Sequence, residues 1–236
     1  MSPESKQKIQ LVLAFAIIVA GARTGYILYE RHSAKMEQAR LRLQSKPIDP
    51  DYYVIPKKLY PYDLKSSRQL VQQPVWVKEG YRYTYYPYEN HRTDFAHEAG
   101  KLLPLQKLQI KDVVLDHTPG SPGEQQLMAV FEDSGKTYAF PIGSLRNGNY
   151  QIYSDEMLYI QDPHELYKHW SRDVWQAIDQ HQVKSGMSEL QTDFAIGMGI
   201  PEPSTSADVK TVNYPNGGKP FSITFRDGKA AEIRQS

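Results

Sequence analysis

The sequence predicts an α+β protein in which an N-terminal membrane helix precedes two small folded modules. Three observations lead to this prediction: an uncharged apolar run near the N-terminus, a middle region of short β-type runs separated by turn residues, and a C-terminal third in which helix signals precede strand signals. We place the boundaries at 1–30 for the membrane segment, 31–66 for a helical stalk and Pro-rich linker, 67–161 for a β module and 162–236 for a C-terminal module.

The composition argues against several classes of protein. The 236 residues include 28 Lys or Arg and 27 Asp or Glu, so the net charge is +1. Proteins that bind nucleic acid usually have a basic excess, and we therefore expect no nucleic-acid partner. The absence of cysteine excludes disulfides, cysteine-ligated zinc, thiol nucleophiles and a lipid carried on cysteine. A hydrophobic content of 40% is sufficient for a folded core.

The apolar run from Ile9 to Ala22 contains one polar residue, Gln10, and no charge. As a helix it spans about 21 Å, whereas the hydrocarbon core is about 30 Å thick, so an uncleaved anchor has to extend to about Tyr29 with Arg23 snorkelling outward. The alternatives are a signal peptide cleaved after Ala22 and a buried soluble helix. The residues expected to contact lipid are Ile9, Leu11, Val12, Leu13, Phe15, Ile17, Ile18 and Val19.

The charges that flank this run bear on its orientation. Five Lys or Arg residues follow it up to Arg42, and only Lys6 and Lys8 precede it. Taken alone, the positive-inside rule favours a cytoplasmic C-terminus. A short leader followed by a large folded body is nevertheless the usual layout of an exported chain. We therefore expect a single-pass anchor with the body on the extracytoplasmic, periplasmic side.

We interpret residues 31–66, between the anchor and the folded body, as a stalk and linker. Residues 33–44 are strong helix formers with little apolar surface, which predicts a solvated continuation of the anchor helix. Residues 46–61 carry four prolines, which favour a semi-rigid extended spacer. Aromatic residues in and beside the spacer predict that it lies against a surface; they are Tyr52, Tyr53, Tyr60 and Tyr62.

The middle region predicts a small β module. Residues 74–78 and 81–85 are expected to form two strands that turn at Glu79-Gly80. A further strand is expected near 106–115, a hairpin over 127–142, and an Asn-Gly turn with a strand over 147–153. Five or six short strands with little helix favour a small barrel or rolled sheet of the SH3-like kind.

The C-terminal third predicts two helices followed by a three-stranded antiparallel sheet. Asp162-Pro163-His164-Glu165 opens a helix whose apolar stripe includes Ile178. Ser188 caps a second, shorter helix that ends at Gly197. The expected strands are Val209–Tyr214, Phe221–Phe225 and Ala230–Ile233. The module therefore has the order ααβββ.

One pattern in this third can be compared with known families. It comprises Gly186-Met187-Ser188, Gln191, Phe194, Gly197, Pro201, Tyr214, Phe225-Arg226-Asp227-Gly228-Lys229 and Ile233. A Gly-Met-Ser start, a short helix ending in Gly and Pro, and a hairpin with an Asp-Gly turn resemble the BamE/SmpA-type envelope modules. These are small ααβββ domains of the outer-membrane β-barrel assembly machinery, and their usual members carry a lipid on an N-terminal cysteine. The resemblance covers residues 163–236 and implies fold more than function, because its residues are caps, turns and core.

Motifs for catalysis and metal binding are incomplete. His97-Glu98 begins a string typical of metalloproteases, but Lys101 stands where the second histidine is required. Asp94 with His97, and Asp116 with His117, lack a third ligand. We therefore expect no catalytic residue, no cofactor, no bound metal and no small-molecule ligand.

Aromatic residues concentrate in the predicted strands of the β module. Alternate tyrosines either line a small core or present a contact surface to a protein or glycan. The candidates for partner contact are Trp76, Tyr81, Tyr83, Tyr85, Tyr86 and Tyr88. We expect a non-catalytic, membrane-tethered envelope protein that binds other proteins as an interaction or assembly scaffold. The alternatives are a cell-wall or glycan-binding module that uses the tyrosine-rich sheet, and an enzyme of unrecognised type.

Overall fold

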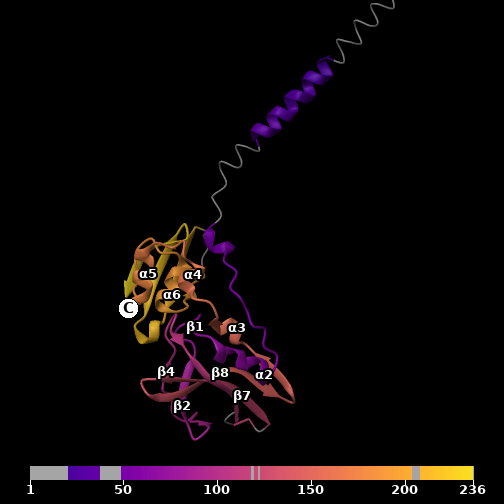
Figure 1. Ribbon diagram of the computed structural model, residues 1–236. Coiled ribbons are helices and arrows are strands. Elements are labelled where there is room, and N and C mark those ends of the chain that lie inside the picture. Colours follow the sequence, from indigo (N-terminus) through magenta and orange to yellow (C-terminus); the bar gives the residue numbers. More distant parts are fainter. Residues whose placement is uncertain (1–20, 38–48, 118–119, 122, 204–207, 236) are drawn as a thin grey trace, which may run out of the picture. The chain divides into compact units, whose positions relative to one another are not determined.

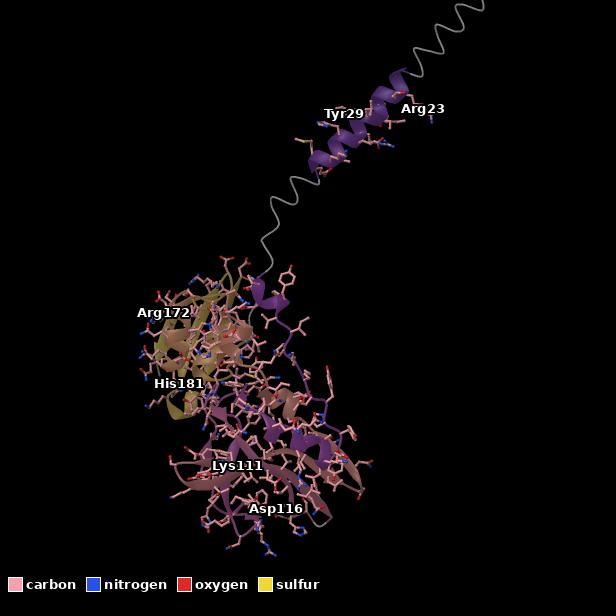
Figure 2. The ribbon with its side chains drawn as sticks, viewed as in Figure 1. Arg23, Tyr29, Lys111, Asp116, Arg172 and His181 are labelled. Atoms are coloured by element: carbon pink, nitrogen blue, oxygen red, sulfur yellow. The ribbon has the colours of Figure 1, made fainter. Side chains whose placement is uncertain are left out.

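The computed structural model describes residues 21–37, 49–117, 120–121, 123–203 and 208–235 (Figure 1). The chain forms two compact units, and the boundary between them lies between Tyr52 and Tyr53. In unit 1, residues 21–37 form a helix that carries Arg23 and Tyr29 (Figure 2).

The apolar run Ile9–Ala22 of the predicted membrane segment falls outside the described residues, apart from its last two positions. This applies to all of the residues expected to contact lipid, which are Ile9, Leu11, Val12, Leu13, Phe15, Ile17, Ile18 and Val19. Within the described ranges, no helix combines the length and the apolar character that a bilayer crossing requires.

The first part of unit 2 is built on antiparallel strands. Seven of them form one sheet in the order β3-β2-β8-β7-β6, with β4 on β2 and β9 on β8. Their bounds are β2 (Thr84–Glu89), β3 (Arg92–Thr93), β4 (Gly100–Lys101), β6 (Ile110–His117), β7 (Glu124–Asp133), β8 (Lys136–Arg146) and β9 (Asn149–Ile152). A smaller sheet has the order β10-β1-β5, from β10 (Leu158–Tyr159), β1 (Val75–Val77) and β5 (Lys107–Leu108). Three short helices accompany these sheets: α2 (Leu64–Ser67), η2 (Arg68–Gln72) and α3 (Ser154–Met157). A further short helix, η1 (Pro50–Tyr53), spans the boundary between the two units.

The turns of the large sheet follow from their residues. Ser134 and Gly135 join β7 to β8, and Asn147 and Gly148 join β8 to β9; all four have positive φ. Two-residue turns of this kind match the right-handed twist of the paired strands. The predicted hairpin and the predicted strand after Asn147-Gly148 are therefore confirmed.

The expected pairing of residues 74–78 with 81–85 is wrong. β1 pairs with β10 and β5, whereas β2 pairs with β8, β3 and β4. Gly80 packs so closely on Pro104 that a Cβ there would lie 2.2 Å from the proline ring. The segment after Leu102 occupies the place beside β1, since the Leu105 N–H donates to the Val77 carbonyl at 3.0 Å. The chain after Gly80 therefore leaves β1 instead of folding back on it.

The C-terminal part contains three helices and an antiparallel sheet, grouped together in Figure 1. The helices are α4 (Pro163–Leu166), α5 (Arg172–Asp179) and α6 (Glu189–Ile196). The sheet has the order β11-β12-β13-β14, from β11 (Ile200–Pro201), β12 (Val209–Tyr214), β13 (Phe221–Arg226) and β14 (Lys229–Gln235), and η3 (Asn216–Gly218) joins β12 to β13. The three predicted strands are confirmed, and the short β11 adds a fourth. The capping box of Ser188 and Gln191 at α6 is confirmed as well.

The single helix expected to begin at Pro163 and to continue beyond Ile178 is in fact two helices. Ser171 caps α5, because its hydroxyl accepts a hydrogen bond from the Val174 N–H at 3.4 Å. In the link between the helices the rings of Tyr167 and Trp170 stack with centroids 4.5 Å apart. The predicted apolar stripe is buried, so periodicity identified the face correctly but not the break.

Two apolar clusters form most of the core of unit 2. The C-terminal cluster contains Trp170, Phe194 and Phe225, together with Trp76 from β1 and Tyr159 from β10. The β cluster lies in the first part of the unit and includes Phe131, Phe140 and Ile142. The small sheet thus supplies side chains to the core of the C-terminal part.

Residues 53–62, which run from the end of η1 towards α2 and mostly lack regular secondary structure, pack on both clusters and are called the strap below. Val54 packs against the C-terminal cluster and Leu59 against the β cluster. The sequence predicted that the tyrosines of this region lie against a surface. In the structure Val54 and Leu59 make this contact instead. Tyr53, Tyr60 and Tyr62 are strongly exposed.

Candidate protein-binding groove

A hollow of about 360 Å³ opens on unit 2 where three segments of the chain meet. The segments are the loop between β1 and β2, the connection from α6 to β11, and the turn between β12 and β13. Because β12 to β14 form a continuous sheet under α6, the last two segments are held on one framework. The lining residues of this Tyr81 groove are Gly80, Tyr81, Arg82, Ile196, Met198, Gly199, Ile200, Pro201, Pro215 and Asn216.

Tyr81 stands between this groove and a second hollow that Lys101 and Gly218 help to line. Its φ of 62° is in the left-handed region, where a bulky residue is strained. Its N–H donates to the Leu102 carbonyl at 2.7 Å, which fixes this backbone conformation.

Two glycines make room for the Tyr81 ring. A Cβ on Gly217 would lie 2.8 Å from Tyr81 Cε1, and a Cβ on Gly197 would lie 3.1 Å from Tyr81 Cδ2. Both glycines also have positive φ, at 60° and 83°. The ring is thus positioned by close backbone approach on two sides, and burial raises the pKa of its hydroxyl.

The side chains at the mouth of the groove are apolar and open to solvent. Ile200 is 65% exposed and Met198 is 45% exposed, while Ile196 is buried. A large aliphatic side chain at this exposure gains free energy when another surface covers it, at about 25 cal/mol per Å². A partly buried ring beside two exposed aliphatic side chains is an arrangement typical of protein contact sites.

The charged residues near the groove differ in how they are paired. Arg82 Nη1 lies 2.8 Å from Glu79 Oε2 and 3.7 Å from Met198 Sδ. Glu79 also accepts a hydrogen bond from the Tyr83 hydroxyl at 3.3 Å. Lys101, on the other side of Tyr81, takes part in none of the ion pairs found among the described residues.

A polar pair lies behind the groove wall. A Cβ on Gly199 would approach the Tyr214 ring to 2.7 Å, so this wall is a single layer of backbone. Asp193 Oδ1 and the Tyr214 hydroxyl are both buried here, and each side chain influences the pKa of the other. Burial raises the pKa of Asp193 to about 7 and also raises that of Tyr214.

The six predicted contact residues do not share one surface. Tyr81 lines the groove, whereas Trp76 is buried in the C-terminal cluster. Tyr83 and Tyr85 pack on the β cluster, and Tyr86 and Tyr88 pack on a third, smaller cluster; all four keep partial exposure. Burial raises the pKa of the Tyr83 hydroxyl, with the Glu79 charge as the second cause. A contact role for these residues stays a prediction.

Of the residues that line the groove, Tyr81 alone was among the six candidates from the sequence; Met198, Ile200 and Pro215 are three of those that the sequence reasoning missed. The Gly197-Met198-Gly199 string was the available signal, because two glycines around an exposed methionine mark a place where backbone comes close to other atoms.

The aspartates of the incomplete metal motifs are bound by other groups of the chain. His97 Nδ1 lies 2.8 Å from Asp94 Oδ2, and the Thr93 N–H donates to Asp116 Oδ2 at 2.6 Å. In the described ranges, three or more side chains suited to one metal ion do not come together.

Comparison with known proteins adds no relative: no family model, no curated protein and no solved structure matches the chain.

Proposed function

We propose that the protein is a non-catalytic envelope protein, tethered to the membrane by its N-terminal segment, whose unit 2 binds a partner protein through the Tyr81 groove. The uncharged apolar run Ile9–Ala22 supports the tether, and the body lies on the periplasmic side in this proposal. The exposure of Ile200 at the mouth of the groove is the observation that carries the binding role.

The chemistry of the groove indicates what it binds. Its mouth is apolar, so an aliphatic side chain of the partner would exchange water for contact with Met198 and Ile200. Lys101 lies on the far side of the Tyr81 ring and can pair with a carboxylate. The expected ligand is therefore a protein segment in which an aliphatic residue stands next to an acidic one.

The same proposal includes the types of the two modules that make up unit 2. The order α5, α6, β12, β13, β14 supports an ααβββ module of the BamE/SmpA type, and the short antiparallel strands before it support an SH3-like module. Modules of that type belong to an assembly machinery in the cell envelope. A scaffold role in contacts between envelope proteins agrees with a groove suited to a protein side chain.

Site-directed crosslinking tests this proposal in the full chain. A photo-crosslinking amino acid in place of Met198 is expected to give a discrete crosslinked band with one partner in intact membranes. Ile200→Asp places a charge at the apolar mouth and should weaken the band at least about tenfold, since a buried unpaired carboxylate is costly. Lys101→Glu should weaken it less.

The matched control is Ile233→Asp, which changes a partly exposed isoleucine on the last strand of the sheet, outside both the groove and residues 53–62. The band should keep its intensity in this variant. A band that persists in Ile200→Asp, or that vanishes equally in Ile233→Asp, would contradict binding at the groove.

A further inference from the structure

Several large aromatic and aliphatic side chains of the strap are exposed to solvent. Tyr53, Ile55, Tyr60 and Tyr62 are each 70–85% exposed. Their neighbours Val54 and Leu59 are turned towards the core clusters. The exposed side chains therefore belong to a segment that is itself packed against the protein.

The backbone of the strap is fixed by buried and half-buried side chains. The Asp155 carboxylate accepts hydrogen bonds from the Leu59 N–H at 3.0 Å and from the Tyr60 N–H at 2.7 Å. Gln161 Oε1 accepts one from the Lys57 N–H at 2.8 Å. Tyr60 is held at a φ of 51°, in the left-handed region that a bulky residue rarely adopts. Strain of this kind persists where the surrounding structure imposes it, and it is frequent at functional sites.

The strap is also positively charged. Residues 53–62 include Lys57 and Lys58 and no acidic residue. Both lysines are exposed, and neither is part of an ion pair between described residues. The nearby carboxylates are engaged, since Asp155 binds the strap backbone and Asp63 binds Ser66. The lysines are thus available to an anionic partner.

We propose that the strap is a membrane-surface contact. Its tyrosine rings and Ile55 enter the headgroup region of an anionic bilayer, while Lys57 and Lys58 bind lipid phosphates. Tyrosine is enriched at the membrane interface because its ring is apolar and its hydroxyl is polar. Lysines near an anionic surface add electrostatic attraction. The proposal rests on the proposed membrane tether, which supplies the reason to choose a bilayer over a protein.

The length of the tether permits this contact. Thirty residues separate Ala22 from Tyr53, and residues 23–37 are helical. At 1.5 Å per helical residue and at most about 3.4 Å per other residue, the connection spans no more than about 75 Å. A body confined within this distance meets the surface at a high effective concentration, so individually weak contacts are sufficient.

The test uses the full chain in vesicles of phosphatidylcholine with or without phosphatidylglycerol. The chain has no cysteine, so Ile55→Cys provides a single attachment point for an environment-sensitive fluorophore. In anionic vesicles the label is expected to shift to the blue and to be quenched by a nitroxide carried at a shallow position on a lipid. Ser134→Cys, at the exposed turn between β7 and β8, is the matched control. Quenching at residue 55 should exceed quenching at residue 134 at least about twofold.

The double variant Lys57→Glu, Lys58→Glu, labelled at residue 55, should lose this excess, as should high salt. Carbonate extraction of the same vesicles tests the tether separately. A chain that resists carbonate but shows equal quenching at residues 55 and 134 overturns the strap contact and leaves the tether standing. Quenching at residue 55 in a chain that carbonate removes supports the strap contact and contradicts the tether. Undiminished quenching in the double variant overturns the assignment to an anionic surface.

Discussion

Asp193 on α6 and Tyr214 at the end of β12 bring two polar groups into the interior behind the groove wall. Burial is the main cause that raises the pKa of Asp193 to about 7, and the neighbouring Tyr214 hydroxyl partly opposes it. The charge of Glu189 raises this pKa further, while Lys210 lowers it. Lys210 contributes little because its ammonium pairs with Glu189 at 2.7 Å. The carboxyl of Asp193 is therefore protonated up to a higher pH in the folded chain than in the unfolded chain.

This raised pKa predicts how stability depends on pH. The ordinary pKa of an aspartate is 3.8 and the folded value is about 7. Between these values the folded chain holds a proton that the unfolded chain has released, so stability decreases as pH rises from about 4 to about 7. Asp193→Asn removes the titration, so its stability relative to the parent protein should be higher at about pH 8 than at about pH 5, by at most about 3 kcal/mol. Urea denaturation at both pH values measures the effect, and an unchanged pH dependence in the variant would contradict it.

Among the elements, β13 places alternate side chains on the two faces of the C-terminal sheet. Ile223 and Phe225 are buried in the C-terminal cluster. Thr224, between them, points to the opposite face and lies with its hydroxyl 3.3 Å from that of Thr211 on β12. This alternation follows from the pleat of a strand whose one face is covered by helices.

Substitutions on the two faces of β13 should therefore differ in cost. Phe225→Ala leaves a cavity in the cluster and is expected to lower the free energy of unfolding by about 3–5 kcal/mol. Thr224→Ala is the matched control on the same strand, and should cost less than about 1 kcal/mol. Chemical denaturation of both variants gives the comparison. If both variants lost the same free energy of unfolding, or if Phe225→Ala lost less than about 1 kcal/mol, the assignment of Phe225 to the buried face would be contradicted.

In unit 2 as a whole, the strand-rich part and the helical part share side chains. Trp76 comes from β1 in the first part, yet it packs in the same cluster as Trp170 and Trp175 of the second. β1 also pairs with β10, next to the start of the helical part. A side chain that belongs to one part and is buried in the other couples the stabilities of both.

This coupling predicts a single unfolding transition for unit 2. All three tryptophans of the chain lie in the C-terminal cluster, so their fluorescence reports that cluster alone. Far-UV circular dichroism reports the strands of the large sheet as well. We expect the two signals to change at the same denaturant concentration in the full chain, which is the usual test of a two-state transition. Fluorescence that changes well before the circular dichroism would show that the two parts unfold separately.

The sequence by itself determined the features whose signals lie within a few residues of each other. Ser188 and Gln191 specified the start of α6, Asn147-Gly148 specified a tight turn, and the alternation of residues 221–225 specified β13. These features depend on local hydrogen bonds, backbone sterics and the period of a strand, all of which are encoded in adjacent residues. The same information identified Tyr81 only as one of six aromatic candidates.

Only the tertiary structure decided which strand lies beside β1, where the helix after Pro163 breaks, and which side chains surround Tyr81. Tyr81 and Ile200 are more than a hundred residues apart in the chain and line one groove. Their proximity depends on how the loop after β1 packs against the turn after α6, where Gly197 leaves no space for a Cβ. Contacts of this kind arise from the competition of many side chains for the same space, and no local pattern of residues records its outcome.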